Sequence, residues 1–290
     1  MFAIFTDSDA DMPLDLIEKY DVGVVPFGIS YGDEVFHRDF YELGSKQFFT
    51  KCREADVWPR TSQPTFADYE ERFRPVLEQG HDIFCLCISQ KFSGSYQSGH
   101  LAMTSLAEEF PDRKIVVMDS RRCTVLHGYL VYQACLMRES GMGFDAVSAA
   151  IEGIRDDHFV YITVDSLEYL RKGGRLGKAS ALAGSLLGIK PIITMGDGEL
   201  QPHSKVRGKK NAMTTIISSI DKAISDRSKY TAIPMTTDMP AENVELSAAL
   251  ARMGFTPPPG HWTIGPVVGA HLGPTGFGVV ALKKYEGQRD

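Results

Sequence analysis

The sequence predicts a two-domain α/β protein, with an N-terminal parallel sheet flanked by helices and a C-terminal α+β domain. Three observations lead to this fold class. Apolar runs of strand length alternate with segments of helical spacing in the first half of the chain, a pattern typical of parallel strands joined by helices. The second half instead mixes a hairpin with further strands and helices. The chain has 290 residues, which is enough to bury two medium-sized cores.

The first half supplies the expected parallel sheet. The run 82–88 is almost continuously apolar, as in a strand that is buried on both faces. The expected strands are 2–5, 22–26, a hairpin over 28–36 turned at Gly32-Asp33, 82–88 and 114–118. The expected helices are 14–20, 42–54, 66–79, one that opens within 93–102, 125–138 and 145–155. The segment 59–64 is polar and predicts a loop.

The second half begins at a boundary near Asp156, which gives domains 1–156 and 157–290. The sequence Gly196-Asp197-Gly198 is a turn signal and predicts a hairpin over 191–206. The other expected strands are 159–163, 230–234 and 279–282. The expected helices are 167–170, a small-residue helix over 179–187, 212–225 and 242–253.

Composition and charge exclude several classes of protein. The 31 Lys and Arg residues against 37 Asp and Glu give a formal net charge of −6, which argues against a nucleic-acid binder. No run of 18 apolar residues occurs, and carboxylates stand where a signal peptide would be apolar, so we expect a cytoplasmic protein with no membrane span. The five cysteines are odd in number and lack a C-x-x-C pair, so we expect buried thiols rather than disulfides or a zinc site.

Motifs for nucleotide, metal and hydrolase sites are incomplete. The segments 141–146 and 276–281 match G-x-G-x-x-A, but neither follows a strand and opens a long helix. The segment 173–178 lacks the Walker spacing. The eight histidines are scattered without metal-ligand spacing, so no metal and no cofactor are expected. An acyl hydrolase that uses Ser93 and His271 stays open as a minor alternative, although no G-x-S-x-G elbow occurs.

Hydroxyl and carboxylate side chains follow three of the expected parallel strands. They are Thr6-Asp7-Ser8, the segment 89–95 and Asp119-Ser120. Ligands of open parallel sheets bind outside the carboxyl ends of the strands, so these loops predict a site on one rim. Any single residue among them is about as well explained as a helix cap, and convergence of the loops is what favours a site.

The remaining motifs form an ordered series along almost the whole chain. They are Thr61-Ser62-Gln63-Pro64, Ser93-Gly94-Ser95-Tyr96, Val117-Met118-Asp119-Ser120, the block 165–175, Ile189-Lys190-Pro191, Lys205-Val206-Arg207-Gly208 and 269–274. Each is weak alone, but in this order and spacing they resemble the DegV family of fatty-acid-binding proteins. Asp9, Ser95 and Leu272 depart from the residues that are common in the family.

The resemblance implies a protein that encloses one long-chain fatty acid, such as palmitate, between two domains and has no catalytic centre. It also implies a partner, a separate ATP-dependent kinase that converts the presented carboxylate to an acyl phosphate. A lipid-responsive sensor or regulator is the alternative role. By resemblance, the residues at the ligand carboxylate are Thr61, Ser93 and His271. Those near the head group or the pocket mouth are Ser62, Gly94, Ser95, Arg175 and Arg207.

Elementary energetics agree with such a ligand. A carboxylate sealed from water needs donors that replace its hydration, and the hydroxyls of Thr61 and Ser93 supply part of this. If His271 is protonated beside the carboxylate, it adds a positive charge, because that neighbour raises the pKa of the imidazole so that it stays charged near neutral pH. A tail of about 14 methylenes contributes on the order of 11 kcal/mol of gross burial. The residues expected to line the tail, each equally well explained as core packing, are Ala183, Leu186, Leu187 and Ile192.

The basic residues are concentrated in one part of this acidic chain. They are Lys172, Arg175, Lys178 and the basic side chains of 203–210. Two interpretations stay open: a solvated face, or a patch around the pocket mouth that attracts the carboxylate or an acidic partner.

Overall fold

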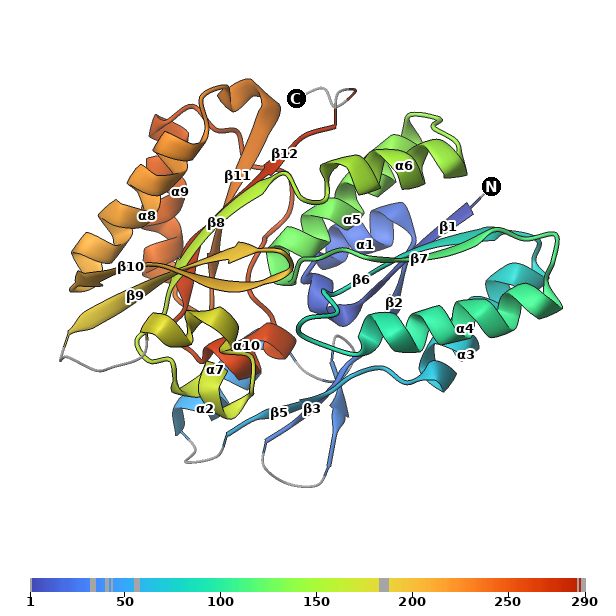
Figure 1. The fold of residues 1–290 in the computed structure, drawn as a ribbon, viewed down its shortest axis with the longest axis horizontal. Helices are drawn as coiled ribbons and strands as arrows, with labels where there is room; N and C mark the ends of the chain where they lie inside the picture. The colour runs from blue at the N-terminus through green and yellow to red at the C-terminus, as the bar shows by residue number, and fades with distance from the viewer. Residues whose placement is uncertain are drawn as a thin grey trace.

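The computed structural model describes residues 2–31, 35–39, 42, 44–54, 58–182, 188–285 and 287. Its two larger sheets lie in different halves of the chain, and Figure 1 shows them side by side with helices on their faces. The mixed α/β fold with a parallel sheet and a separate antiparallel sheet is therefore confirmed. Among the described helices, none is long and apolar enough to cross a membrane.

The first sheet is parallel throughout, with strand order β2-β1-β6-β7. Its strands are β1 (Phe2–Asp7), β2 (Val22–Val25), β6 (Asp82–Cys87) and β7 (Ile115–Asp119). The helices that pack on it are α1 (Leu14–Tyr20), α3 (Phe66–Glu78), α4 (Ser95–Glu109), α5 (Thr124–Glu139) and α6 (Phe144–Ile154). Because side chains alternate along a strand, Phe5 packs with α3 and α4 whereas Ile4 packs with α1 and α5.

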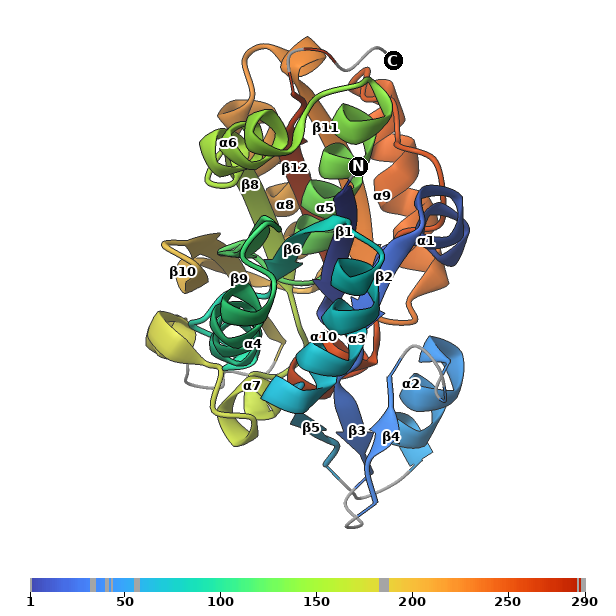
Figure 2. The same ribbon diagram turned by 90° about the vertical axis from the view of Figure 1, so that its right-hand side faces the viewer.

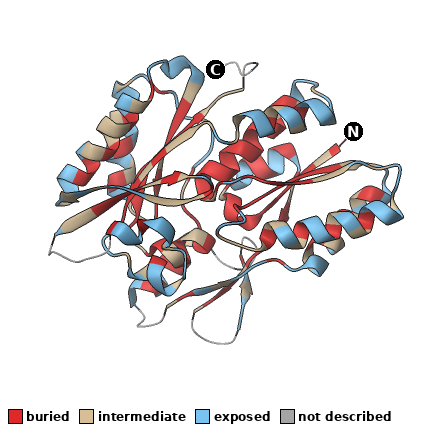
Figure 3. Ribbon diagram, viewed as in Figure 1, coloured by how far each residue is buried: buried red, intermediate tan, exposed pale blue. Residues whose placement is uncertain are grey.

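The second sheet is antiparallel, with strand order β10-β9-β8-β12-β11. Its strands are β8 (His158–Thr163), β9 (Ile189–Gly196), β10 (Glu199–Arg207), β11 (Tyr230–Thr236) and β12 (Phe277–Lys283). One face is covered by α8 (Lys209–Ala223) and α9 (Pro240–Arg252). The other face packs against α5, which also contacts β1 and β6 of the first sheet. Figure 3 accordingly colours most of α5 as buried.

A small third sheet, in the order β4-β3-β5, lies at one end of the molecule together with a helix (Figure 2). Its elements are β3 (Gly28–Ser30), β4 (His37–Arg38), β5 (Arg60–Ser62) and the helix α2 (Ser45–Glu54). Phe48 and Phe49 of α2 pack against Val267 and Ala270 of the late helix α10 (Pro266–Leu272). This packing brings a segment from the first 62 residues beside one that begins at Pro266.

The remaining short elements lie in connections. They are the 3₁₀ turns η1 (Ser8–Ala10), η2 (Gly177–Leu182) and η3 (Arg227–Lys229) and the helix α7 (Glu168–Lys172). The boundary predicted near Asp156 falls between α6 and β8.

The structure differs from the sequence predictions in several segments. The second strand of the predicted hairpin 28–36 is β4, which lies beyond the predicted end and pairs with β3. The predicted polar loop 59–64 contains β5, because Arg60, Thr61 and Ser62 pair their backbones with β3 and need no apolar side chains to do so. Helix α10 was not predicted. The segment 179–187 begins as 3₁₀ turn, and its residues 183–187 lie outside the described residues, as does the predicted turn Gly32-Asp33.

The prediction for the cysteines is correct for four of the five thiols. Those that are buried are Cys52, Cys85, Cys87 and Cys135. Cys123 is half-buried, and all five are free thiols.

Candidate ligand-binding site

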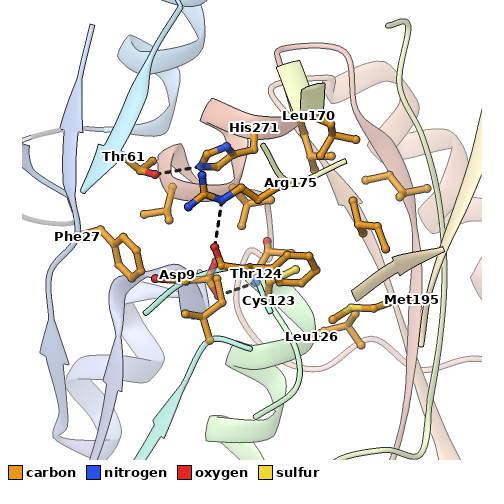
Figure 4. Close-up of a pocket in the computed structure, with 18 of the residues that line it drawn as sticks. Asp9, Phe27, Thr61, Cys123, Thr124, Leu126, Leu170, Arg175, Met195 and His271 are labelled. Carbon is orange, nitrogen blue, oxygen red and sulfur yellow. Dashed lines mark hydrogen bonds between the residues drawn. The ribbon is translucent and has the colours of Figure 1, made fainter. Parts of the chain in front are cut away.

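A cavity of about 390 Å³ lies between the two halves of the chain. This volume is within the range of small-molecule binding sites. The first half contributes Asp9, Phe27, Thr61, Ser62, Gln63, Ile88, Phe92, Ser93, Cys123, Thr124 and Leu126. The second half contributes Val160, Ile162, Leu170, Arg175, Thr194, Met195, Leu200, Met235, Val267, Val268, His271 and Leu272. Polar side chains form one end of the wall, and aliphatic side chains and methionines form most of the rest (Figure 4).

The polar end joins β5 to α10. Thr61 stands opposite Ile29 in the β3–β5 register, and its Oγ1 lies 3.0 Å from Nε2 of His271 (Figure 4). The imidazole packs so closely against Gly173 that a Cβ at that position would lie 2.2 Å from Nδ1. Glycine is therefore required there for the close approach.

The charge state of His271 follows from its burial. Burial, with a smaller contribution from the nearby Arg175, lowers the pKa of His271 to about 4. Without a carboxylate beside it, the imidazole is therefore neutral near pH 7. The charged His271 of the sequence analysis requires that neighbour and stays a prediction. Among the described residues, Nδ1 of His271 has no hydrogen-bond partner.

Arg175 connects the two halves at the cavity wall. Its Nε donates to the backbone carbonyl oxygen of Phe92 at 3.1 Å (Figure 4). The residue is otherwise exposed, so its guanidinium carries a permanent positive charge at the edge of the cavity rather than deep inside it.

The loop that carries Ser93 is held by a hydrogen bond within the loop and by one to Gln63, the residue that follows β5. Oγ of Ser93 accepts from the backbone N–H of Ser95 at 3.2 Å, and the side-chain oxygen of Gln63 accepts from the backbone N–H of Gly94 at 2.8 Å. Ser62 also lines the cavity, whereas Gly94 and Ser95 do not. Ser95 is fully buried and donates its hydroxyl to Asp7 at 2.7 Å.

Two predicted site residues lie elsewhere. Arg207 is exposed at the end of β10, seven residues beyond the lining residue Leu200, which is roughly 23 Å along an extended strand. Ile192 is buried in the cluster that α8 and α9 form on the outer face of the second sheet. Alternation along β9 explains this, because its neighbour Ile193 points to the opposite face. Ala183, Leu186 and Leu187 lie outside the described residues.

The three hydroxyl-rich loops do converge. Asp7, at the end of β1, accepts from the backbone N–H of Ile88 at 3.0 Å and from the hydroxyl of Ser95. Asp119, at the end of β7, accepts from the side-chain amide of Gln90 at 2.8 Å. These hydrogen bonds join the loops to one another, so most of the polar side chains after the parallel strands stabilise the loops. Asp7, Ser95 and Asp119 do not line the cavity, whereas their neighbours Asp9 and Ser93 do.

The sequence analysis did not assign Gln63, Gly173 or Asp9 to a ligand site. Gln63 and Gly173 belong to motifs already singled out, and only their spatial contacts with Gly94 and His271 reveal what they do. Asp9 lines the cavity although its side chain is fully buried. The sequence signal for Asp9 was its departure from the common family residue.

Comparison with known proteins identifies the family to which the chain belongs. A family model described as "Uncharacterised protein, DegV family" matches residues 1–284. The chain belongs to the DegV family. Among curated DegV domain-containing proteins, one from Clostridium acetobutylicum is 32% identical over 279 residues, which cover 95% of each chain.

Solved structures of similar fold include proteins described by a bound lipid. A protein of Eubacterium ventriosum, described as a stearic-acid-binding protein, has a TM-score of 0.91 at 28% identity and covers 99% of this DegV chain and 100% of its own. A DegV family protein of Thermus thermophilus, described by its fatty acid binding, has a TM-score of 0.88 at 32% identity and covers 97% and 99%.

Proposed function

We propose that the protein binds one long-chain fatty acid in the cavity between its two halves. The observation that carries the proposal is the cavity itself. Hydroxyls, an imidazole and a guanidinium lie at one end, and the rest of the wall is mainly apolar apart from Asp9, Thr124 and Thr194. The fatty acids named for the two structural neighbours support the same ligand class. The carboxylate lies at the end that Thr61, Ser93 and His271 form, with Arg175 beside it.

The hydrogen-bonding capacity of this end suits an anion. With its proton on Nε2, the neutral His271 donates to Oγ1 of Thr61, which leaves the hydroxyl proton of Thr61 for the ligand carboxylate. Ser93 can donate in the same way, because among the described residues its Oγ is engaged as an acceptor from the backbone N–H of Ser95 and its hydroxyl proton is not used. Arg175 adds a positive charge, and hydrogen bonds to an ionised group are stronger than neutral ones.

The apolar wall supplies most of the affinity. Each buried methylene contributes about 0.8 kcal/mol, so a tail of about 14 methylenes gives on the order of 11 kcal/mol before the costs of association. The side chains that face the tail come from the second sheet and from α5. They are Leu126, Val160, Ile162, Met195, Leu200 and Met235.

We also propose that the bound carboxylate is presented to a separate ATP-dependent kinase, which implies a cytoplasmic site of action. The support is the family resemblance and the exposure of Arg175 at the head-group end. Of the basic residues nearby, Lys172 lies 3.7 Å from the ring centre of Trp58 and Lys178 pairs with Glu199 at 2.7 Å. The basic stretch from 203 onward lies farther along β10, so the docking surface we propose is centred on Arg175.

The hydrolase alternative has little geometric support. In the described part of the chain, the hydrogen bond of His271 goes to Thr61 rather than to Ser93. A serine nucleophile needs its hydroxyl within hydrogen-bond reach of the base. A sensor or regulator that binds the same lipid remains the second candidate, since it would use the same cavity.

One experiment separates these functions. Delipidated protein is titrated with palmitate and with hexadecanol, which has the same tail without a carboxylate, and the loaded protein is then offered to an acyl kinase with ATP. A carrier binds palmitate more tightly and supports acyl phosphate formation. Tight binding without phosphoryl transfer favours the sensor, and equal affinity for acid and alcohol contradicts the proposed head-group end.

A further inference from the structure

A cluster of two carboxylates and an imidazole is sealed inside the protein where β1 ends beside the first turn of α5. The side chains of Asp7, Asp9 and His127 are fully buried. Nδ1 of His127 lies 3.2 Å from Oδ2 of Asp9 and 3.7 Å from Oδ1 of Asp7. One potential ligand atom from each residue lies within 4.8 Å of the other two.

Each carboxylate of the cluster is held through one oxygen. Oδ2 of Asp7 accepts from the hydroxyl of Ser95 at 2.7 Å and from the backbone N–H of Ile88 at 3.0 Å. Oδ2 of Asp9 accepts from the backbone N–H of Thr124 at 3.1 Å. Within the described part of the chain, Oδ1 of Asp7 and Oδ1 of Asp9 have no hydrogen-bond partner. Buried carboxylate oxygens in proteins are rarely left without a hydrogen-bond donor, a water molecule or an ion beside them.

The imidazole is held in the same way, through the ring nitrogen that faces away from the carboxylates. Nε2 of His127 lies 3.2 Å from the backbone carbonyl oxygen of Leu86 and 3.1 Å from Oγ1 of Thr6. A proton on Nε2 that is donated to the carbonyl leaves the lone pair of Nδ1 directed at Asp7 and Asp9. Histidines that bind metals characteristically donate their other ring N–H to a carbonyl or carboxylate in this manner.

Charge balance favours a cation in the cluster. Among the described residues, His127 is the one basic side chain within 4 Å of either carboxylate. One divalent ion would neutralise both carboxylates.

An acidic cavity gives the cluster a route of entry for cations. Asp7 lines a second cavity of about 410 Å³, and the other carboxylates in its wall are Asp11, Asp39 and Glu42. The described residues that line this cavity include no lysine and no arginine. Clefts lined by one sign of charge concentrate ions of the opposite sign.

We propose that Asp7, Asp9 and His127 bind one divalent transition-metal ion. A tetrahedral ion with bonds of about 2.0 to 2.2 Å separates its ligand atoms by about 3.3 to 3.6 Å, close to the separations of 3.2 and 3.7 Å around Nδ1. One imidazole and two carboxylates suit Zn²⁺ or Mn²⁺. The ion ties η1 to α5, beside the cavity that Asp9 lines. No metal was expected from the sequence, because the histidines lack metal-ligand spacing. His127 lies 118 residues from Asp9, so no local motif joins them.

The test uses untagged full-length protein that has been stripped with a chelator and dialysed. Zn²⁺ and Mn²⁺ are added separately, and metal content and thermal unfolding are measured. The proposal expects one ion per chain and a rise in the midpoint of roughly 5 to 10 °C at a metal concentration about 100 times the dissociation constant. Co²⁺ is added as a spectroscopic probe, and a bound ion gives visible bands with a nitrogen and oxygen ligand set.

Substitutions of the proposed ligands test whether the metal binds at this cluster. Asp9→Asn and His127→Gln each lower metal affinity at least about ten-fold, because ligand loss removes a coordinate bond. His158→Gln, which changes a partly buried histidine outside the cluster, retains full metal content. If a ligand variant folds poorly, the stoichiometry and midpoint shift of the native protein decide alone. The proposal is overturned if the native protein binds neither metal stoichiometrically, or if binding is unchanged in both ligand variants.

Discussion

Two histidines lie in polar regions beside the same cavity, and they differ in what surrounds them. His271 faces the hydroxyl of Thr61 and lies near Arg175, whereas His127 faces two buried carboxylates. Burial lowers the pKa of both imidazoles, so both are neutral ligands or donors rather than charges. The neighbours of a neutral imidazole therefore determine which kind of ligand its surroundings suit. Around His271, a hydroxyl donor and a guanidinium suit an anion. Around His127, two carboxylates suit a cation.

The largest effect is expected from a substitution in the cluster of Asp7, Asp9 and His127. Asp7→Ala removes the acceptor of two buried donors, the hydroxyl of Ser95 and the backbone N–H of Ile88. We expect a loss of about 2 to 5 kcal/mol in the free energy of unfolding, measured by urea denaturation. Asp145→Ala is the control, because Asp145 is exposed and its ion pair with Lys114 is worth little. Similar stabilities for the two variants would show that Asp7 is not a structural acceptor.

The next effect displaces His271 without changing it. Gly173→Ala places a Cβ against Nδ1, so the imidazole must move away from Thr61. We expect fatty-acid affinity to fall by at least about ten-fold in a calorimetric titration, since the hydrogen-bonded end of the cavity is lost. The matched control is Gly153→Ala in α6, where a Cβ meets open space and binding should not change. Native affinity in Gly173→Ala would refute the role given to this contact.

Single hydroxyls have a smaller effect. Thr61→Ala and Ser93→Ala should each weaken binding of palmitate by about 1 to 2 kcal/mol, because each removes one donor to a carboxylate. Binding of hexadecanol should change less, which separates the head group from the tail. Thr104→Ala in α4 removes an exposed hydroxyl that bonds its own helix and serves as the control. Unchanged palmitate affinity in both site variants would remove the proposed head-group end.

The smallest effect is a pH dependence of stability that His271 contributes. The unfolded chain protonates His271 near its ordinary pKa of 6.5, but the native imidazole does so only near 4. Stability from this group is therefore complete above pH 6.5 and is lost as the pH falls towards 4. Between pH 7.5 and 5.5 the loss is about 1 kcal/mol.

The measurement is urea denaturation of ligand-free native protein and of His271→Gln at both pH values. The variant should lose less stability than the native protein over this interval. An equal loss in the two proteins would place the imidazole in water-like surroundings and would contradict its burial.

Much of the fold could be predicted from the sequence, because long elements carry their own periodicity. The buried strand 82–88 and the helix 125–138 appear in the structure as β6 and α5 within two residues at each end. Short elements could not be predicted in this way. β5 consists of polar residues whose structure comes from pairing with β3, and α10 is a single short helix that packs on α2.

For the candidate site, the sequence predicted which residues take part but not how they are arranged in space. Thr61, Ser93, Arg175 and His271 do line one cavity, although they are separated by up to 210 residues. Arg207 was assigned with them by resemblance to the family, but β10 extends away from the cavity before it reaches this residue. The cluster around His127 was not predictable, since its partners meet only when the end of β1 packs on α5.

The most direct test of the central claim is native mass spectrometry of the purified protein, followed by denaturing extraction and identification of any released lipid. We predict one bound molecule per chain with the mass of a long-chain fatty acid, released on unfolding and replaced when palmitate is added to the stripped protein. A protein that is purified empty and takes up no added fatty acid would contradict the account, whatever its fold.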